Sequence, residues 1–121
     1  MHKSKITGLG FEVPENVVKN ADLEEIMETS DEWIQTRSGI KERRWATEDL
    51  ATSDLAISAS KKAMEMAGVS SEDIDLVIVG TLSSDYFFPG VSAQLQDKLN
   101  LRNIAAFDIK AACSAFVYCL S

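Results

Sequence analysis

The sequence predicts an α/β fold, and three of its features support that prediction. Strand-like and helix-like stretches alternate along the 121 residues, with no internal repeat and no low-complexity segment. Residues 74–79 are almost all apolar and rich in β-branched side chains, which is typical of a strand covered by helices on both faces. Residues 53–67 show the apolar spacing of an amphipathic helix, with small alanines that suit packing on a sheet. We therefore expect a mixed, largely parallel sheet with helices on both faces.

The first elements lie between residues 5 and 27. Residues 5–9 form an apolar-leaning run that Gly8 and Gly10 end, which predicts a first strand. Asn20 is interpreted as the N-cap of a helix, because apolar residues follow it at helical spacing and acidic residues occupy its first turn.

A second, shorter helix is expected to follow the cap sequence of residues 29–32 and to end at Gly39. Residues 40–45 alternate weakly between charged and apolar side chains and predict a short strand. Two more elements, a helix over residues 91–99 and a buried strand over residues 104–109, come after the central helix and strand.

The last stretch, residues 111–120, is small and apolar enough to predict a helix packed deep in a core. It contains both cysteines of the chain, Cys113 and Cys119. Six helical residues rotate the chain by about 600°, so the two sulfurs face different directions and we expect free thiols. The spacing fits no zinc motif, and His2 is the single imidazole, so no metal site is expected.

Charge and hydropathy exclude several classes of function. The 12 Lys and Arg residues against 19 Asp and Glu residues give a net charge of −7, and no basic stripe is present. A nucleic-acid partner or an anionic membrane surface is therefore not expected. No apolar run approaches the roughly 20 residues of a membrane span, and the first residues lack a signal-peptide pattern. We expect a cytoplasmic protein.

Cys113 is the strongest candidate for a reactive side chain. It is expected in a tight turn between a parallel strand and a helix, where free backbone N–H groups and the helix dipole stabilise a thiolate. The crevice beyond the carboxyl ends of parallel strands is also where open α/β sheets bind ligands. By pattern alone a small buried cysteine is the alternative, because free cysteines are among the most buried residues.

Five motifs resemble the N-terminal part of the β-ketoacyl-acyl carrier protein synthase III family, within the thiolase-like superfamily. They span nearly the whole chain and occur in the order and at the spacing of that family. The motifs are NADLE at residues 20–24, TSDEWI at 29–34, TRSGI at 36–40, ERR at 42–44 and FDIKAAC at 107–113. The resemblance implies a thiolase-like fold in which residues 1–121 are most of the N-terminal half, as a truncated domain.

The resemblance implies that Cys113 is the catalytic nucleophile. It would accept an acyl group from acyl-CoA and pass it to the carbanion formed when malonyl-acyl carrier protein loses CO2. No permanently bound cofactor is implied, since the coenzyme A thioester is a substrate. The family's catalytic histidine and asparagine lie in the C-terminal half of the family's proteins, and neither occurs in a recognisable motif of this sequence. Residues 1–121 alone are therefore not expected to catalyse condensation.

The family's coenzyme A contacts correspond to Thr29, Trp33 and Arg37. Trp33 and Arg37 are four residues apart and share one helix face, where an indole can stack on adenine and a guanidinium can meet adenine or phosphate. An aromatic ring packed on an arginine stem is the structural alternative. Lys41, Arg43 and Arg44 are interpreted as a solvated charged face.

Phe88, in the aromatic loop 83–89, corresponds to the family residue that reaches the partner's acyl pocket in a homodimer. A loop folded on its own core is the alternative. Ala115 stands where the family commonly has glycine and Lys110 where it has small or polar residues, so the acyl-chain preference stays open. Two other functions also stay open: a related starter-unit or secondary-metabolite ketosynthase, and a non-catalytic module that binds coenzyme A or another subunit.

Overall fold

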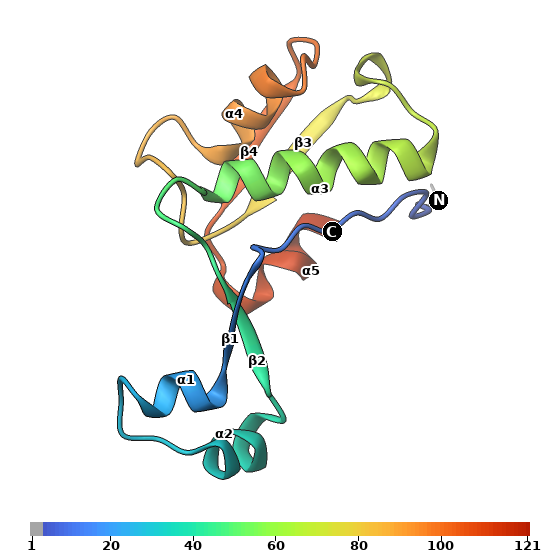
Figure 1. Cartoon of the computed structure of the whole chain (residues 1–121). Coiled ribbons are helices and arrows are strands. Elements are labelled where there is room, and N and C mark those ends of the chain that lie inside the picture. Colours follow the sequence, from blue (N-terminus) through green and yellow to red (C-terminus); the bar gives the residue numbers. More distant parts are fainter. Residues whose placement is uncertain (1–3) are drawn as a thin grey trace. The chain divides into compact units, whose positions relative to one another are not determined.

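The computed structural model of the protein describes residues 4–121, and these residues form two compact units. One unit comprises residues 13–50, and the other comprises residues 4–12 together with residues 51–121. Each unit holds one two-stranded sheet (Figure 1). His2, the single imidazole of the chain, lies outside the described residues.

The unit 13–50 is built on an antiparallel pair of strands, in which Val18 lies opposite Arg43. Ser30 caps the second helix by accepting the backbone N–H of Trp33 at 3.1 Å, and Gly39 ends that helix with φ 71°. Both the cap and the stop agree with the sequence-based prediction. The elements of this unit are β1 (Asn16–Lys19), α1 (Asn20–Glu24), α2 (Asp31–Ser38) and β2 (Glu42–Trp45).

Asn20 is not the N-cap predicted from the sequence but the first residue of α1. The preceding Lys19 takes the cap position, and its backbone N–H donates to the Asp22 carboxylate at 2.6 Å. Asn20 is 1% exposed, and its side chain bonds to groups of α2, β2 and the loop between them. The competing partners are far away in sequence, so the local cap pattern could not reveal them.

The other unit is built on a parallel pair of strands, in which Ile78 lies opposite Phe107. The helix predicted from Ser53 to Gly68 and the parallel pairing are confirmed, and Gly68 ends the helix with φ 67°. Its elements are α3 (Thr52–Ala67), the 3-10 turn η1 (Ser71–Asp73), β3 (Leu76–Gly80), α4 (Val91–Lys98), β4 (Ala105–Ile109), the 3-10 turn η2 (Ala112–Ser114) and α5 (Ala115–Leu120).

Residues 5–9 do not form the predicted first strand. They run in an irregular extended path along α3, where the Cα atoms of Gly8 and Gly10 come so close to the helix that a side chain would collide with the carbonyl groups of Ala63 and Ala59. The backbone N–H of Leu9 donates to the Met66 sulfur at 3.3 Å instead of to a neighbouring strand. The two glycines therefore permit helix packing here rather than ending a strand.

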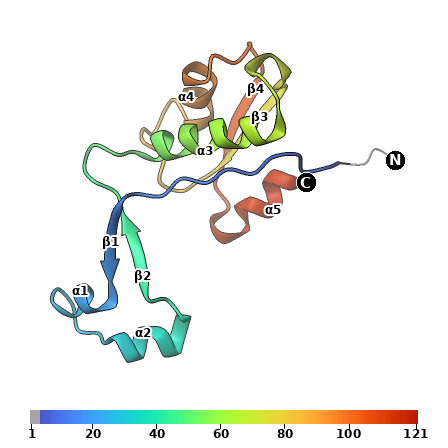
Figure 2. The ribbon, with the colours of Figure 1, turned by 45° about the vertical axis from the view of Figure 1, so that its right-hand side comes forward.

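The helix α5 is not packed deep in a core, as the sequence predicted. Ala115 is its buried residue, whereas the side chains of Phe116 and Val117 are 70% and 67% exposed. In Figure 2 α5 lies apart from α4, and its packing runs through Ala115 against Gly80 at the end of β3. One contact face buries only one side of a helix, so the other apolar residues stay exposed.

The α/β class is confirmed, but the predicted mixed, largely parallel sheet is observed as two separate pairs of strands, one antiparallel and one parallel. Leu76, the first residue of β3, is 49% exposed, so this strand is not covered on both faces along its whole length. Among residues 4–121, no helix has the length and apolar character needed to cross a membrane.

Candidate active site

Cys113 lies in the turn η2 between β4 and α5, as the strand–turn–helix pattern predicted. Its side chain is exposed, which argues against the buried-cysteine alternative. The turn is tight, because the backbone N–H of Ser114 donates to the Ala111 carbonyl at 3.0 Å and Ala112 has φ 46°. An alanine in the left-handed region carries backbone strain, which is a feature found at functional turns. Both Cys113 and Cys119 are free thiols.

The segment before α4 carries the aromatic side chains Tyr86, Phe87 and Phe88, which are 62%, 98% and 85% exposed. Their exposure contradicts a loop folded onto its own core within the described residues. The ring of Phe87 lies 5.7 Å from the Lys110 ammonium, a distance at which a cation and an aromatic ring attract each other. Lys110 thus has a defined contact, close in sequence to Cys113.

The polar residues of this segment anchor it to neighbouring elements. Asp85 accepts the backbone N–H of Ser53 at 3.0 Å, which satisfies one free donor of the first turn of α3. The hydroxyl of Thr52 donates to the Ser83 carbonyl at 2.5 Å. The aromatic side chains are therefore held outward on a backbone that is fixed at its polar positions.

Asp108, at the end of β4, caps the first turn of α4. Its carboxylate accepts the backbone N–H groups of Val91 and Ser92, each at 2.8 Å. Burial opposes the charged form of Asp108, but the hydrogen bonds from Ser92 and Val91 and the charge of Lys110 outweigh it and hold its pKa below the ordinary value. The strand that leads to Cys113 is thereby tied to the end of the aromatic segment.

Trp33 and Arg37 lie together on α2, with the guanidinium carbon 5.7 Å from the centre of the indole ring. Trp33 is 59% exposed, so part of the residue's surface stays open to a ligand. A planar aromatic group beside a guanidinium is a combination that binds an adenine ring and a phosphate.

Thr29 shares a pocket with Trp33. The pocket has a volume of about 250 Å³ and is lined by Glu28, Thr29, Ser30 and Trp33. The structure therefore brings Thr29, Trp33 and Arg37 together within the unit 13–50. Cys113 and Phe88 belong to the other unit.

The sequence reasoning missed the contact between Asn20 and Arg43. Arg43 was interpreted as part of a solvated face, but its guanidinium donates to the Asn20 side-chain oxygen at 2.6 Å and to the Val18 carbonyl at 3.2 Å. One signal was present: alternation along a strand places Arg43 on the face opposite to Glu42 and Arg44.

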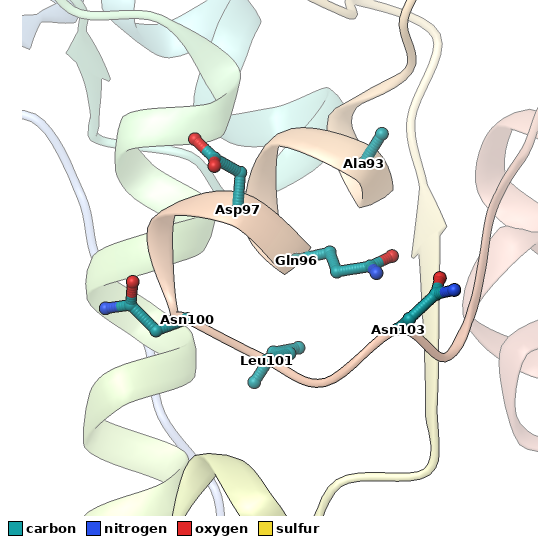
Figure 3. A pocket seen from close by; sticks show the side chains of 6 residues that line it. All are labelled: Ala93, Gln96, Asp97, Asn100, Leu101 and Asn103. Atoms are coloured by element: carbon teal, nitrogen blue, oxygen red, sulfur yellow. The ribbon is translucent and has the colours of Figure 1, made fainter.

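A separate pocket, shown in Figure 3, lies at the C-terminal end of α4 and the turn that follows it. Its volume is about 650 Å³, and it contains none of the residues predicted to act on a substrate. Gln96 is held there by donating its side-chain N–H to the Arg102 carbonyl at 3.1 Å. The residues that line this pocket are Ala93, Gln96, Asp97, Asn100, Leu101 and Asn103.

The chain is similar in sequence to β-ketoacyl-[acyl-carrier-protein] synthase III proteins. It is 52% identical over 120 residues to the β-ketoacyl-[acyl-carrier-protein] synthase III of Clostridium perfringens, covering 99% of this chain and 37% of that protein. It is 54% identical over 113 residues to a synthase III of Bacillus cereus, covering 93% of this chain and 36% of that protein. The chain thus spans a little over a third of the length of these relatives. No family model matches the sequence.

Solved structures show the same relationship in three dimensions. The crystal structure of 3-oxoacyl-[acyl-carrier-protein] synthase III from Aquifex aeolicus matches 96% of this chain and 37% of its own, with a TM-score of 0.91 and 47% identity. The priming β-ketosynthase of the R1128 polyketide pathway matches 96% of this chain and 35% of its own, with a TM-score of 0.91 and 34% identity. The chain therefore has the thiolase-like fold and is a homologue of the β-ketoacyl-[acyl-carrier-protein] synthase III enzymes, corresponding to their N-terminal portion.

Proposed function

We propose that this chain carries the acyl-accepting cysteine and the coenzyme A face of a condensing enzyme that starts fatty-acid synthesis. The observation that carries the proposal is the 52% identity over nearly the whole chain to a synthase III. The exposed Cys113 in its tight turn and the Trp33–Arg37 pair are the two local features that support it. The substrates proposed are an acyl-CoA and malonyl-acyl carrier protein, and the proposed location is cytoplasmic.

Cys113 would act as the nucleophile in the first step. Its thiolate attacks the thioester carbonyl of acyl-CoA, and the bond to the coenzyme A sulfur breaks as the new thioester forms. The proton lost by the Cys113 thiol ends on the departing coenzyme A thiolate, which leaves as the thiol. The acyl group stays activated, because a thiolate is a competent leaving group in the second step.

Thr29, Trp33 and Arg37 would hold the nucleotide end of coenzyme A. The indole of Trp33 offers a flat apolar surface for adenine, and the guanidinium of Arg37 offers paired donors for phosphate oxygens. The pocket that Thr29 shares with Trp33 would hold part of the ligand beside the indole. No metal and no permanently bound cofactor is part of this proposal.

The second step, condensation with malonyl-acyl carrier protein, needs groups that promote decarboxylation. The chain has one histidine, His2, and the family's histidine and asparagine motifs do not occur in the sequence. We therefore expect the 121 residues to accept an acyl group without releasing CO2 from malonyl-acyl carrier protein.

Mass spectrometry after incubation with acetyl-CoA tests the first step. The chain should gain one acetyl group on Cys113, Cys113→Ala should gain none, and the matched control Cys119→Ala should react like the unchanged chain. Acetylation that persists in Cys113→Ala would contradict the assignment. Coenzyme A binding that survives in Cys113→Ser, without acyl transfer in the unchanged chain, would instead favour the non-catalytic binding module.

A starter-unit ketosynthase is the second candidate, and the similarity to the R1128 priming β-ketosynthase favours it. Both candidates use the same cysteine, so they differ in the acyl group that they select. Competition between acetyl-CoA and longer or branched acyl-CoA thioesters for Cys113 separates them. A clear preference for the longer acyl group would favour the starter-unit function.

Phe88 is proposed to contact the partner in a homodimer and to border its acyl pocket. The support for this is its exposure of 85% in a segment whose polar residues are anchored. Large apolar side chains that stay exposed are characteristic of surfaces that other groups cover.

A further inference from the structure

A polar side chain, rather than an apolar cluster, lies at the centre of the unit 13–50. Within the described part of this unit, Val18 and Asn20 are the buried residues. The amide group of Asn20 donates to Asp31 at 2.7 Å and to the Ile40 carbonyl at 2.8 Å, and its oxygen accepts from Arg43 at 2.6 Å. One buried side chain thus connects α1 with α2, β2 and the chain between them.

The bond to Asp31 reaches the first residue of α2. The second carboxylate oxygen of Asp31 accepts the side-chain N–H of Gln35 at 2.7 Å, one turn further along the helix. The backbone N–H of Asp31 donates to the Glu24 carboxylate at 2.6 Å. Asp31 therefore links Asn20 to the first turn of α2, two residues before Trp33.

We propose that Asn20 is the positioning residue of the coenzyme A face, because it sets the place of α2 and so of Trp33 and Arg37. This inference rests on the proposed function for the identity of the ligand, but not for the role of Asn20 in holding the helix. An amide is the group that fits, since it donates two hydrogen bonds and accepts one here. A carboxylate could accept from Arg43 but could not donate to Asp31 or Ile40.

The variant Asn20→Asp tests this with almost no change of shape. At about neutral pH the introduced carboxylate faces the Asp31 carboxylate, so the link to α2 is replaced by repulsion. Acidification to about pH 4.5 should place one proton between the two carboxyl groups and restore a hydrogen bond. Glu24, Lys41 and Arg43 are the other charged groups near this pair, and they remain the same in every variant compared.

The matched control is Asn16→Asp, which makes the same chemical change at an exposed position of β1 in the same unit. A second variant, Asn20→Asp combined with Asp31→Asn, exchanges the two groups. The amide then stands on α2 and donates back to the carboxylate, so the bond between positions 20 and 31 is kept with its direction reversed, while the bond to the Ile40 carbonyl stays lost. This reversed pair distinguishes a specific link from a general loss of stability.

The first measurement is the hydrogen-exchange protection of the α2 backbone amides, and the second is the affinity for coenzyme A by calorimetry. Asn20→Asp should lower both about tenfold at neutral pH, the size expected for losing a hydrogen bond to a charged group. The acidic sample and the reversed pair should recover the part of the protection that depends on the bond to position 31, while Asn16→Asp stays like the unchanged chain.

Two results would overturn the proposal: protection of α2 in Asn20→Asp equal to that in Asn16→Asp, or a reversed pair no better protected than the single variant. Absence of coenzyme A binding by the unchanged chain would overturn the proposed coenzyme A face instead. In that case the exchange measurement still decides the role of Asn20.

Discussion

The carboxylate of Asp108, at the end of β4, accepts the backbone N–H of Ser92 in the first turn of α4 at 2.8 Å. Gly90 makes this contact possible, because a side chain there would lie within 2.6 Å of the Asp108 carboxylate. The residues of β4 that lead to Cys113 and the residues that follow Phe88 are thereby joined by one charged group.

Loss of this charge should destabilise the chain. Asp108→Asn removes the charge and leaves one acceptor oxygen for the two backbone N–H groups of Val91 and Ser92, so we expect the free energy of unfolding to fall by about 1 kcal/mol, the usual size of a cap contribution. Urea unfolding followed by circular dichroism measures the change. Asp97→Asn, at the C-terminal end of the same helix, is the control and should be neutral or slightly stabilising, because a negative charge is unfavourable there. Equal losses in both variants would refute a capping role.

The stability contributed by Asp108 should depend on pH in one direction. Its pKa in the folded chain lies below the ordinary value of 3.8, since hydrogen bonds from Ser92 and Val91 outweigh the opposing effect of burial. The contribution is therefore complete above the unfolded pKa and disappears as the pH falls through the folded one. Unfolding curves of the unchanged chain and Asp108→Asn should converge at low pH. A difference that grows on acidification would contradict this.

Gly80 and Ala115 should show coupled effects on stability. A methyl group at position 80 would lie 2.7 Å from the Ala115 side chain and 3.3 Å from the Cys119 sulfur. Gly80→Ala should therefore cost about 1–3 kcal/mol through overpacking against α5. Ala115→Gly removes the nearest obstacle, so the double variant should be less destabilised than the sum of the single ones. Strictly additive free energies of unfolding would show that the two residues do not touch.

Trp33 should contribute more to coenzyme A binding than the other tryptophan of the unit. Stacking of a base on an aromatic side chain contributes about 1–3 kcal/mol, so Trp33→Leu should weaken binding about tenfold or more. Trp45→Leu is the matched control, because Trp45 is also half-exposed but lies on β2. Calorimetric titration with coenzyme A measures both. An equal effect of the two substitutions would argue against a specific adenine contact at Trp33.

Phe88 should matter for self-association. Phe88→Ala is expected to lower the fraction of dimer in sedimentation velocity, because the side chain contributes a large exposed apolar surface. Phe11→Ala is the control: Phe11 is 77% exposed but lies in the segment along α3. A dimer fraction that falls equally in both variants would assign the effect to general surface hydrophobicity.

The elements that the sequence predicted well are those whose signals are local. Ser30 and Gly39 bound α2 because a hydroxyl cap and a left-handed glycine act within one helical turn. The parallel pair β3 and β4 followed from two short apolar runs separated by a helix. The turn that holds Cys113 was predicted in the same way, from a strand, small residues and a helix in succession.

The elements that the sequence missed depend on partners distant in the chain. Residues 5–9 look like a strand, but Gly8 and Gly10 let them pack on Ala63 and Ala59 of α3 instead. The strand β1 is polar at both ends and exists through its pairing with β2. No local pattern contains these contacts.

What the sequence determined by itself is the set of elements whose signals are local, a candidate for the reactive cysteine, Cys113, and the resemblance to a condensing enzyme. What only the tertiary structure decided is which polar groups meet. The local sequence predicts Asn20 as a helix cap. In the structure its buried side chain instead bonds to Asp31 and Arg43, which lie 11 and 23 residues further along the sequence. The physical reason is that a buried amide must satisfy its donors and acceptor wherever the fold brings partners, and sequence spacing does not encode that place.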